Sequence, residues 1–282
     1  MDIGIGLPNA VHGVDRPSIL GFATRAEERG FSSLATIDRL AFHNYEPLVT
    51  LGAAGAVTER INLVTDVLNL PWHQNAALIA KQAATLDNFS QGRLVLGVGL
   101  GARDDDYELA GVPKERKGER MDAMLEEMTN VWAGDVIGPD PFRGDRPRVL
   151  VGGSVDASFR RAAKYGDGWA MGANTPDALR DGVEKVRAAW SEQGREGEPY
   201  VQALCYFALG ENAREIADAG LRDYYGWLGE DIANAIVQAA VITPEMAQQY
   251  RDAFAQAGAD ELIYFAESTD PAQVDLLADA VL

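Results

Sequence analysis

The chain has 282 residues, of which 47% are hydrophobic and 24% are charged, so it can bury a large core and disorder is excluded as its main state. Its 43 acidic and 25 basic residues give a net charge of −18, which repels nucleic-acid backbones and anionic lipid surfaces. We therefore expect neither nucleic acid nor membrane as a partner, and an anionic cofactor would need a local cluster of positive or N–H groups.

Eight short β-branched runs alternate with longer amphipathic stretches along the chain. This alternation is typical of repeated β-α units with a parallel sheet, and eight strands favour a closed (β/α)8 barrel. A doubly wound sheet uses the same units and remains the alternative. The predicted strands are Ile3–Leu7, Ser33–Ile37, Ile61–Val67, Arg93–Gly97, Val149–Val151, Gly168–Met171, Val201–Leu209 and Glu261–Phe265.

Helical patterns fill most of the segments between these strands, and several end at a glycine. The segment Gly134–Pro147 is rich in glycine and proline and is predicted as a loop insertion before the fifth strand. Residues Glu211–Asp260 are acidic and helical, so we expect them to cover the barrel after the seventh strand. No linker is apparent, which predicts one domain over residues 1–282. The predicted helices are Ser18–Arg29, Ala76–Phe89, Glu119–Trp132 and Ala157–Tyr165.

The N-terminal segment MDIGIGLPNA lacks the basic and apolar regions of a signal peptide, and no run reaches the roughly 20 apolar residues that cross a bilayer. These features predict a cytoplasmic protein. The single cysteine, Cys205, excludes an intramolecular disulfide. It lies in an apolar run and is interpreted as a buried hydrophobic residue.

The third and fourth predicted strands carry unusual residues near their ends. Thr65 and Asp66 are polar within an apolar strand, where buried polar groups need partners and where barrel enzymes place their active sites. After the fourth strand, Gly97, Gly99 and Gly101 follow a G-x-G-x-G spacing, which differs from the dinucleotide fingerprint. These glycines permit either close approach of a ligand or tight turns.

The fifth predicted strand ends in Gly152, Gly153 and Ser154, directly before a predicted helix. Bare backbone at a helix N-terminus is a typical cradle for an anion such as a phosphate. A serine at this place is also a common helix N-cap, and the two roles are compatible.

Nine short motifs occur in an order that resembles the luciferase-like monooxygenase superfamily, in particular its actinobacterial branch of coenzyme F420-dependent oxidoreductases. The resemblance covers nearly the whole chain. The motifs are DIGIGLP (2–8), AEERGF (26–31), YEPL (45–48), VTERI (57–61), AKQAATLD (80–87), GRLVLGVG (92–99), GVP (111–113), VGGS (151–154) and YGDGW (165–169).

The resemblance implies a barrel with a flavin or deazaflavin ring over the C-terminal strand ends and the cofactor phosphate near Gly152–Ser154. It also implies a bulge after the third strand, with a non-prolyl cis peptide at or next to Asp66–Val67 that backs the ring. Arg120 matches a family arginine that can reach the phosphate, and its alternative role is that of a solvated helix residue. Further residues expected at the cofactor are Thr65, Gly97, Gly99 and Trp169.

Departures from the family pattern concern the catalytic groups. Many relatives have Asp-His where this chain has Asp38-Arg39, so a histidine is missing and Arg39 is expected to act electrostatically on an anionic cofactor or substrate. His43 is the candidate replacement, although a lone loop histidine is often a surface residue. His73 stands where relatives read Arg-His-Pro and is expected to contact the ring or phosphate. Asp106, in an acidic run, is either a solvated residue or an acid or base.

The resemblance implies hydride transfer between coenzyme F420 and a small organic substrate, with FMN as the alternative cofactor and no metal site. An FMN-dependent monooxygenase, a non-catalytic flavin-binding protein and an enzyme without redox cofactor are the alternative functions. F420 has an anionic tail that favours positive charge at the barrel mouth. The residues available for it are Arg39, His73, Arg103, Arg120, Arg160 and Lys164, and Asp104–Asp106 oppose them. The sequence leaves the substrate and the oligomeric state open, and a homodimer is compatible with it.

Overall fold

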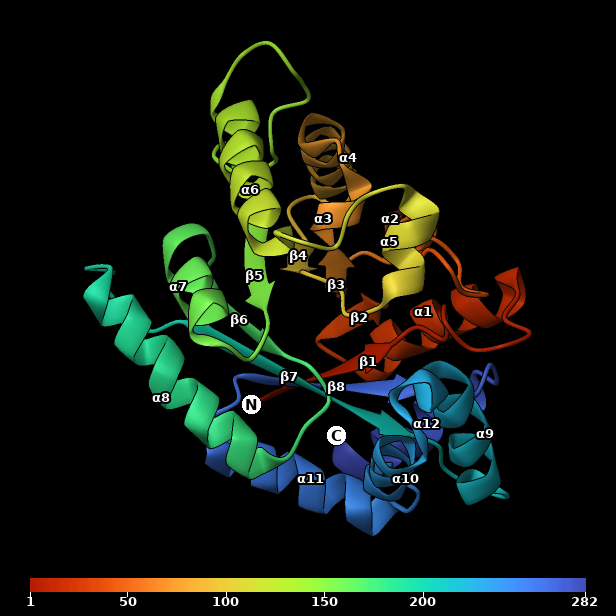
Figure 1. Cartoon of the computed structure of the whole chain (residues 1–282). Coiled ribbons are helices and arrows are strands. Elements are labelled where there is room, and N and C mark those ends of the chain that lie inside the picture. The colour runs from red at the N-terminus through yellow and green to blue at the C-terminus, as the bar shows by residue number, and fades with distance from the viewer.

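The computed structural model describes residues 1–282 and shows a closed barrel of eight parallel strands in the order β1 to β8 (Figure 1). The first strand pairs with both the second and the last, Ile5 facing Leu34 on one side and Tyr264 on the other. This closure confirms the predicted barrel and excludes the doubly wound sheet. The strands are β1 (Asp2–Gly6), β2 (Ser33–Thr36), β3 (Asn62–Asn69), β4 (Leu94–Gly99), β5 (Arg148–Gly152), β6 (Gly168–Met171), β7 (Tyr200–Phe207) and β8 (Glu261–Ala266).

Helices surround the barrel and follow its strands (Figure 1). Helix α1 (Arg16–Arg29) shows how the sequence sets their limits, because Asp15 caps its first turn by accepting the N–H of Ser18 and Gly30 ends it in a left-handed conformation. The four predicted helices are confirmed as α1, α4 (Ala76–Phe89), α6 (Lys117–Ala133) and α7 (Asp156–Tyr165). The helices that the sequence pattern did not define are α2 (Pro47–Gly55), α3 (Leu70–His73), α5 (Asp104–Ala110), α8 (Pro176–Glu192) and α12 (Ala272–Val281).

Residues after β7 form the predicted helical cover. It consists of α9 (Ala213–Tyr225), the 3-10 turn η1 (Gly226–Leu228), α10 (Glu230–Ala239) and α11 (Pro244–Ala257). The predicted insertion 134–147 has no helix or strand and forms the projecting loop between α6 and β5 at the top of Figure 1. None of the helices combines the length and apolar composition of a membrane span.

The hydrophobic core has two main parts. The larger, of 60 buried residues, packs the helices against the outside of the barrel. The smaller, of 15 residues, includes inward-facing residues such as Val64, Val95 and Leu150 and continues onto α9. The barrel is therefore filled by side chains at its centre, and α9 closes part of its C-terminal end, where active sites of such barrels lie.

Candidate active site

A bulge in β3 places Asp66 and Val67 at the C-terminal part of the barrel. The register of β3 against β4 shifts between Thr65 and Leu68, and the Asp66–Val67 peptide is cis, as predicted. The Thr65 hydroxyl donates to the carbonyl of Gly97 over 2.7 Å. Asp66 is buried and its Oδ2 has no hydrogen-bond partner. Burial, together with the charge of Glu261, raises the pKa of Asp66 to about 7.

Glycines within β4 and at the end of β5 make room for this bulge. A Cβ atom at Gly97 would clash with the Thr65 carbonyl oxygen. At Gly99 it would lie 2.5 Å from Val67 Cγ2, and at Gly152 it would lie 3.2 Å from Val67 Cγ1. Gly97 and Gly99 lie within β4 and have no positive φ, so they serve packing around Val67 rather than a tight turn.

Replacing Gly99 with alanine is therefore expected to destabilise the fold by about 1–3 kcal/mol through overpacking against Val67. Urea unfolding measures this change. The double variant Gly99→Ala/Val67→Ala should recover most of the loss relative to Val67→Ala alone. Gly52→Ala is the control, because its Cβ would meet no atom within 4 Å and it lies in α2. Equal stability of Gly99→Ala and wild type would contradict the packing role.

The segment after β5 has unused N–H donors at the start of α7. No hydrogen bond engages the backbone N–H groups of Gly153 and Ser154, and Ser154 is exposed. Ser154 is not the N-cap. Val155 occupies that position, and the Ser158 hydroxyl bonds to its backbone N–H and carbonyl over 3.1 and 2.6 Å. The phosphate-cradle interpretation of Ser154 therefore fits this geometry better than the capping interpretation.

Gly153 and Trp169 shape this segment. Gly153 has a φ of 130°, which disfavours any side chain, and a Cβ there would lie 2.8 Å from Ser158 Cβ. Its carbonyl accepts the indole N–H of Trp169 over 2.6 Å. Trp169 is fully buried under the loop, so in this structure it supports the cradle from below.

Asp38 and His73 lie together at the ends of β2 and β3. One oxygen of the buried Asp38 carboxylate accepts the backbone N–H of Asn69 over 2.8 Å and lies 3.0 Å from His73 Nε2. The imidazole stacks on Trp72 with a centroid distance of 4.0 Å. A carboxylate and a stacked ring thus fix the orientation of a partly exposed histidine, an arrangement suited to proton transfer.

Arg39 and Asp106 form a buried ion pair. Arg39 Nε donates to Asp106 Oδ2 over 2.7 Å, and its guanidinium packs against the rings of Phe42 and Tyr224, 5.2 and 5.5 Å from their centroids. The other Asp106 oxygen accepts the backbone N–H groups of Leu40 and Ala41 over 2.9 and 2.7 Å. Asp106 is therefore not a solvated residue of an acidic run, and both side chains join the loop after β2 to α5.

Two further predicted site residues, His43 and Arg120, make contacts outside the groups described above. His43 is exposed, and its ring packs against that of His12 at a centroid distance of 5.3 Å. Arg120 donates to the carbonyl of Pro113 over 2.9 Å. Lys117, which the sequence did not single out, donates to the carbonyl of Gly101 in the glycine loop after β4 over 2.7 Å. Burial lowers the pKa of Lys117.

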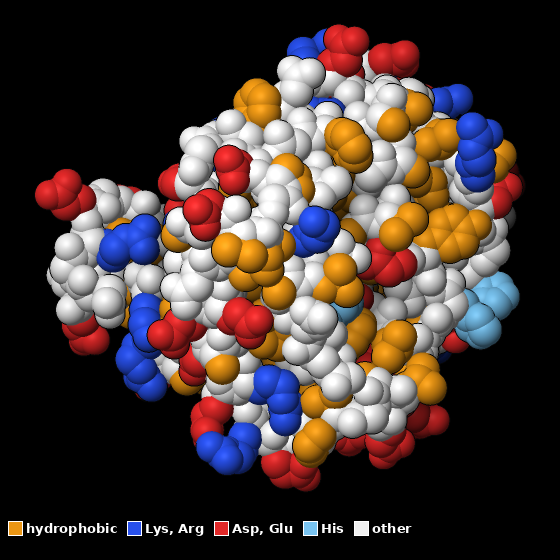
Figure 2. All heavy atoms as spheres, turned by 90° about the horizontal axis from the view of Figure 1, so that it is seen from above, with side chains coloured by type: hydrophobic (Ala, Val, Ile, Leu, Met, Phe, Trp, Pro, Cys, Tyr) orange, Lys and Arg blue, Asp and Glu red, His pale blue; other side chains and the backbone are white.

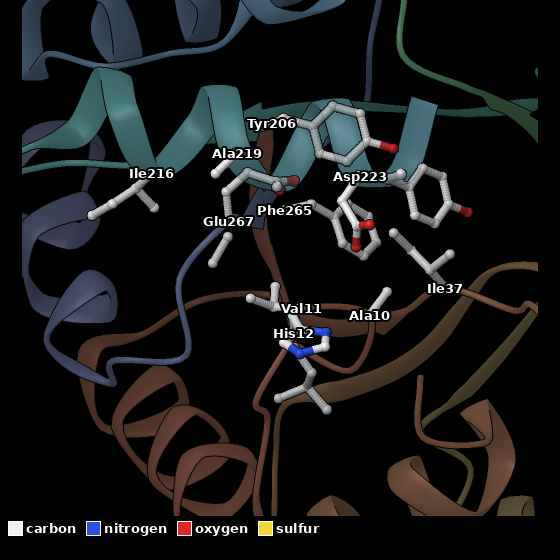
Figure 3. A pocket seen from close by; sticks show the side chains of 14 residues that line it. Ala10, Val11, His12, Ile37, Tyr206, Ile216, Ala219, Asp223, Phe265 and Glu267 are labelled. Atoms are coloured by element: carbon white, nitrogen blue, oxygen red, sulfur yellow. The ribbon is translucent and has the colours of Figure 1, made fainter. Parts of the chain in front are cut away.

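A cavity of about 340 Å³ lies between α9 and the ends of β1, β2, β7 and β8 (Figure 3). The sequence pattern did not single out the polar cavity residues Glu267, Tyr206 on β7 and Tyr224 on α9. Glu267 directly follows β8, so its place at a strand end was the only signal. On the outside, Figure 2 shows hydrophobic side chains gathered around a hollow, with acidic side chains scattered between them.

Comparison with known proteins gives a consistent assignment. The sequence profile described as luciferase-like monooxygenase matches residues 1–264. An uncharacterised protein of Mycobacterium bovis is 32% identical over 240 residues, covering 71% of this chain and 81% of the relative. The F420-dependent glucose-6-phosphate dehydrogenase of Nakamurella multipartita is 34% identical over 198 residues, covering 58% and 57%. The crystal structure of monooxygenase RslO1 from Streptomyces bottropensis has a TM-score of 0.83 at 23% identity, covering 99% and 98%, and shows the same fold.

Proposed function

Because this chain belongs to the luciferase-like monooxygenase family, whose members are enzymes, we propose that it is an oxidoreductase that transfers a hydride between coenzyme F420 and a small organic substrate. The observation that carries the proposal is the pair of unbonded N–H groups at Gly153 and Ser154, which lies at a helix N-terminus beside the barrel mouth. We propose that residues 1–282 act as one catalytic domain.

The residues present fit a flavin or deazaflavin. Gly153, Ser154 and the first turn of α7 would hold the phosphate, and Val67 in the β3 bulge would lie under the ring. Lys117 and His73 would supply positive charge or N–H groups nearby. When bound, such a cofactor supplies two-electron chemistry that side chains do not have. The chain itself contributes binding, orientation and proton handling.

For proton handling we propose His73. Its Nε2 lies 3.0 Å from Asp38 Oδ2, a contact that orients the ring. Arg39 is a poor candidate because a guanidinium stays protonated at physiological pH and because Asp106 already engages it. His43 meets the ring of His12 edge to face and does not line the cavity, so we assign it no catalytic step.

The test is a fluorescence titration of the purified protein with F420 and with FMN. We expect F420 to bind more tightly than FMN. Binding of FMN alone would favour the monooxygenase alternative, and binding of neither would favour an enzyme without redox cofactor. A cofactor that binds but is neither reduced nor oxidised when candidate donors are added would identify a non-catalytic flavin-binding protein.

Replacing Ser154 with aspartate is expected to weaken cofactor binding by about tenfold or more, because it places a negative charge beside the phosphate. The same titration measures the loss. Ser191→Asp is the matched control, since Ser191 is an exposed serine on α8, far along the chain from the cradle. A phosphate bound elsewhere would leave both variants with the wild-type dissociation constant.

A further inference from the structure

The cavity beside α9 is mainly apolar and has no lysine or arginine. Ten of its 14 lining residues are hydrophobic, and neither lysine nor arginine is among them. Figure 3 shows Tyr206, Asp223 and Phe265 on one side and Val11 and His12 on the other. Its volume of about 340 Å³ is at the small end of the roughly 300–1,000 Å³ typical of small-molecule sites. A phosphorylated or carboxylated ligand would find no lysine or arginine there.

Glu267 places a carboxyl group with free hydrogen-bonding capacity in this cavity. Its backbone N–H donates to Phe207, but its carboxyl group has no hydrogen-bond partner in the protein. The carboxyl group lies against the bare backbone of α9 at Gly220, where a Cβ atom would clash with it. Burial raises the pKa of Glu267 to about 8, so the group is a neutral acid near pH 7 and can donate a hydrogen bond.

The neighbouring polar groups are less available. The Tyr206 hydroxyl is already bonded to that of Tyr225 over 2.6 Å. Asp223 is exposed at the cavity edge, and His12 is exposed opposite it. A ligand that enters the cavity therefore meets largely apolar walls, the partly exposed carboxyl group of Glu267 and the hydroxyl of Tyr224.

We infer that this cavity binds the substrate and selects an uncharged, mainly apolar molecule whose carbonyl or hydroxyl oxygen accepts a hydrogen bond from Glu267. Calling the ligand a substrate rests on the proposed function, but binding of the ligand in this cavity does not depend on the cofactor. In a barrel ordered β1 to β8, the cavity at β8 and β1 lies across the mouth from the phosphate cradle after β5. A cofactor ring held between the cavity and the phosphate cradle would face both sites.

The charge preference is tested with three ligands of one shape: cyclohexanone, cyclohexylamine and cyclohexanecarboxylate. Their binding to the purified protein is measured by calorimetry at pH 7. We expect cyclohexanone to bind at least tenfold more tightly than either charged analogue. Tightest binding of the carboxylate would overturn the inference, and tightest binding of the amine would replace it with a site for organic cations.

Variants of Glu267 separate its hydrogen bond from its charge. Glu267→Gln should keep cyclohexanone binding within about threefold, and Glu267→Leu should weaken it about tenfold, the loss of one buried hydrogen bond. Gly220→Ala should act like Glu267→Leu, because the added methyl group displaces the carboxyl group. Wild-type affinity in both Glu267→Leu and Gly220→Ala would show that Glu267 does not hold the ligand.

The pH dependence gives a second readout. Wild-type binding of cyclohexanone should weaken as the pH rises through about 8, and Glu267→Gln should not show this loss. The titratable groups that face Glu267 or line the cavity with it are Tyr206, Tyr224, Tyr225, Asp223 and His12. The glutamine variant retains all five, so the difference reports Glu267 alone. Cofactor titration of the same samples keeps the two proposals apart, since a protein that binds F420 but not cyclohexanone contradicts only this inference.

Discussion

Replacing Arg39 with alanine is expected to destabilise the protein by about 3–5 kcal/mol, because the change leaves Asp106 as a buried carboxylate without its counter-charge. The side chains of both residues are 3% exposed and joined over 2.7 Å. Two backbone N–H groups still reach Asp106 in the variant, but they do not neutralise it. The packing of the guanidinium against the rings of Phe42 and Tyr224 is lost as well.

Urea unfolding of wild type and variant at pH 7 measures this effect. Arg39→Ala/Asp106→Asn should recover part of the loss, because the amide removes the orphan charge and keeps an acceptor. Arg222→Ala is the control at an exposed pair, whose side chains are 43% and 41% accessible, and should change stability by less than about 1 kcal/mol. If Arg39→Ala left the stability unchanged, the ion pair would have no structural role and Arg39 would be free to contact an anionic cofactor.

Local sequence patterns predicted the barrel because each strand leaves its own signal. The runs at residues 168–171 and 76–89 match β6 and α4 residue for residue. The helices that were missed lack such a signal. Helix α2 is short, apolar nearly all round and contains glycines, so its pattern resembles a buried loop. Helix α5 begins in an acidic run, a pattern that predicts solvated surface, although one of its residues, Asp106, is buried.

The site was less predictable because its residues meet only in three dimensions. The glycines of β4 follow from Val67 on β3, about 30 residues earlier in the chain, and no local rule connects them. The Arg39–Asp106 pair joins segments 67 residues apart. Glu267 is one of 43 acidic residues, and only its position after β8 beside Gly220 sets it apart. The β3 bulge was anticipated because the family resemblance implies it, and the strand end at Gly153 was anticipated because glycines there directly precede a helical pattern.

Replacing Asp66 with asparagine is expected to make the protein more stable than wild type at pH 8 and equally stable near pH 4. In the folded protein the pKa of Asp66 is about 7, against an ordinary value of 3.8. Between these values the unfolded chain releases a proton that the folded protein keeps, so wild-type stability falls as the pH rises and levels off above about 7. About three pH units at about 1.4 kcal/mol each give a difference on the order of 4 kcal/mol. Asparagine does not ionise and avoids this loss.

Urea unfolding of both proteins from pH 4 to pH 8.5 tests the sign and the window. Glu267, whose raised pKa falls in the same range, titrates equally in both proteins, so their difference isolates Asp66. Asp135→Asn serves as the control, because Asp135 is exposed in the loop before β5 and should follow the wild-type curve. Parallel curves for Asp66→Asn and wild type would mean that Asp66 ionises freely in the folded state. A widening gap with rising pH means that the β3 bulge holds a protonated carboxyl group near the proposed ring site, where it can donate a hydrogen bond.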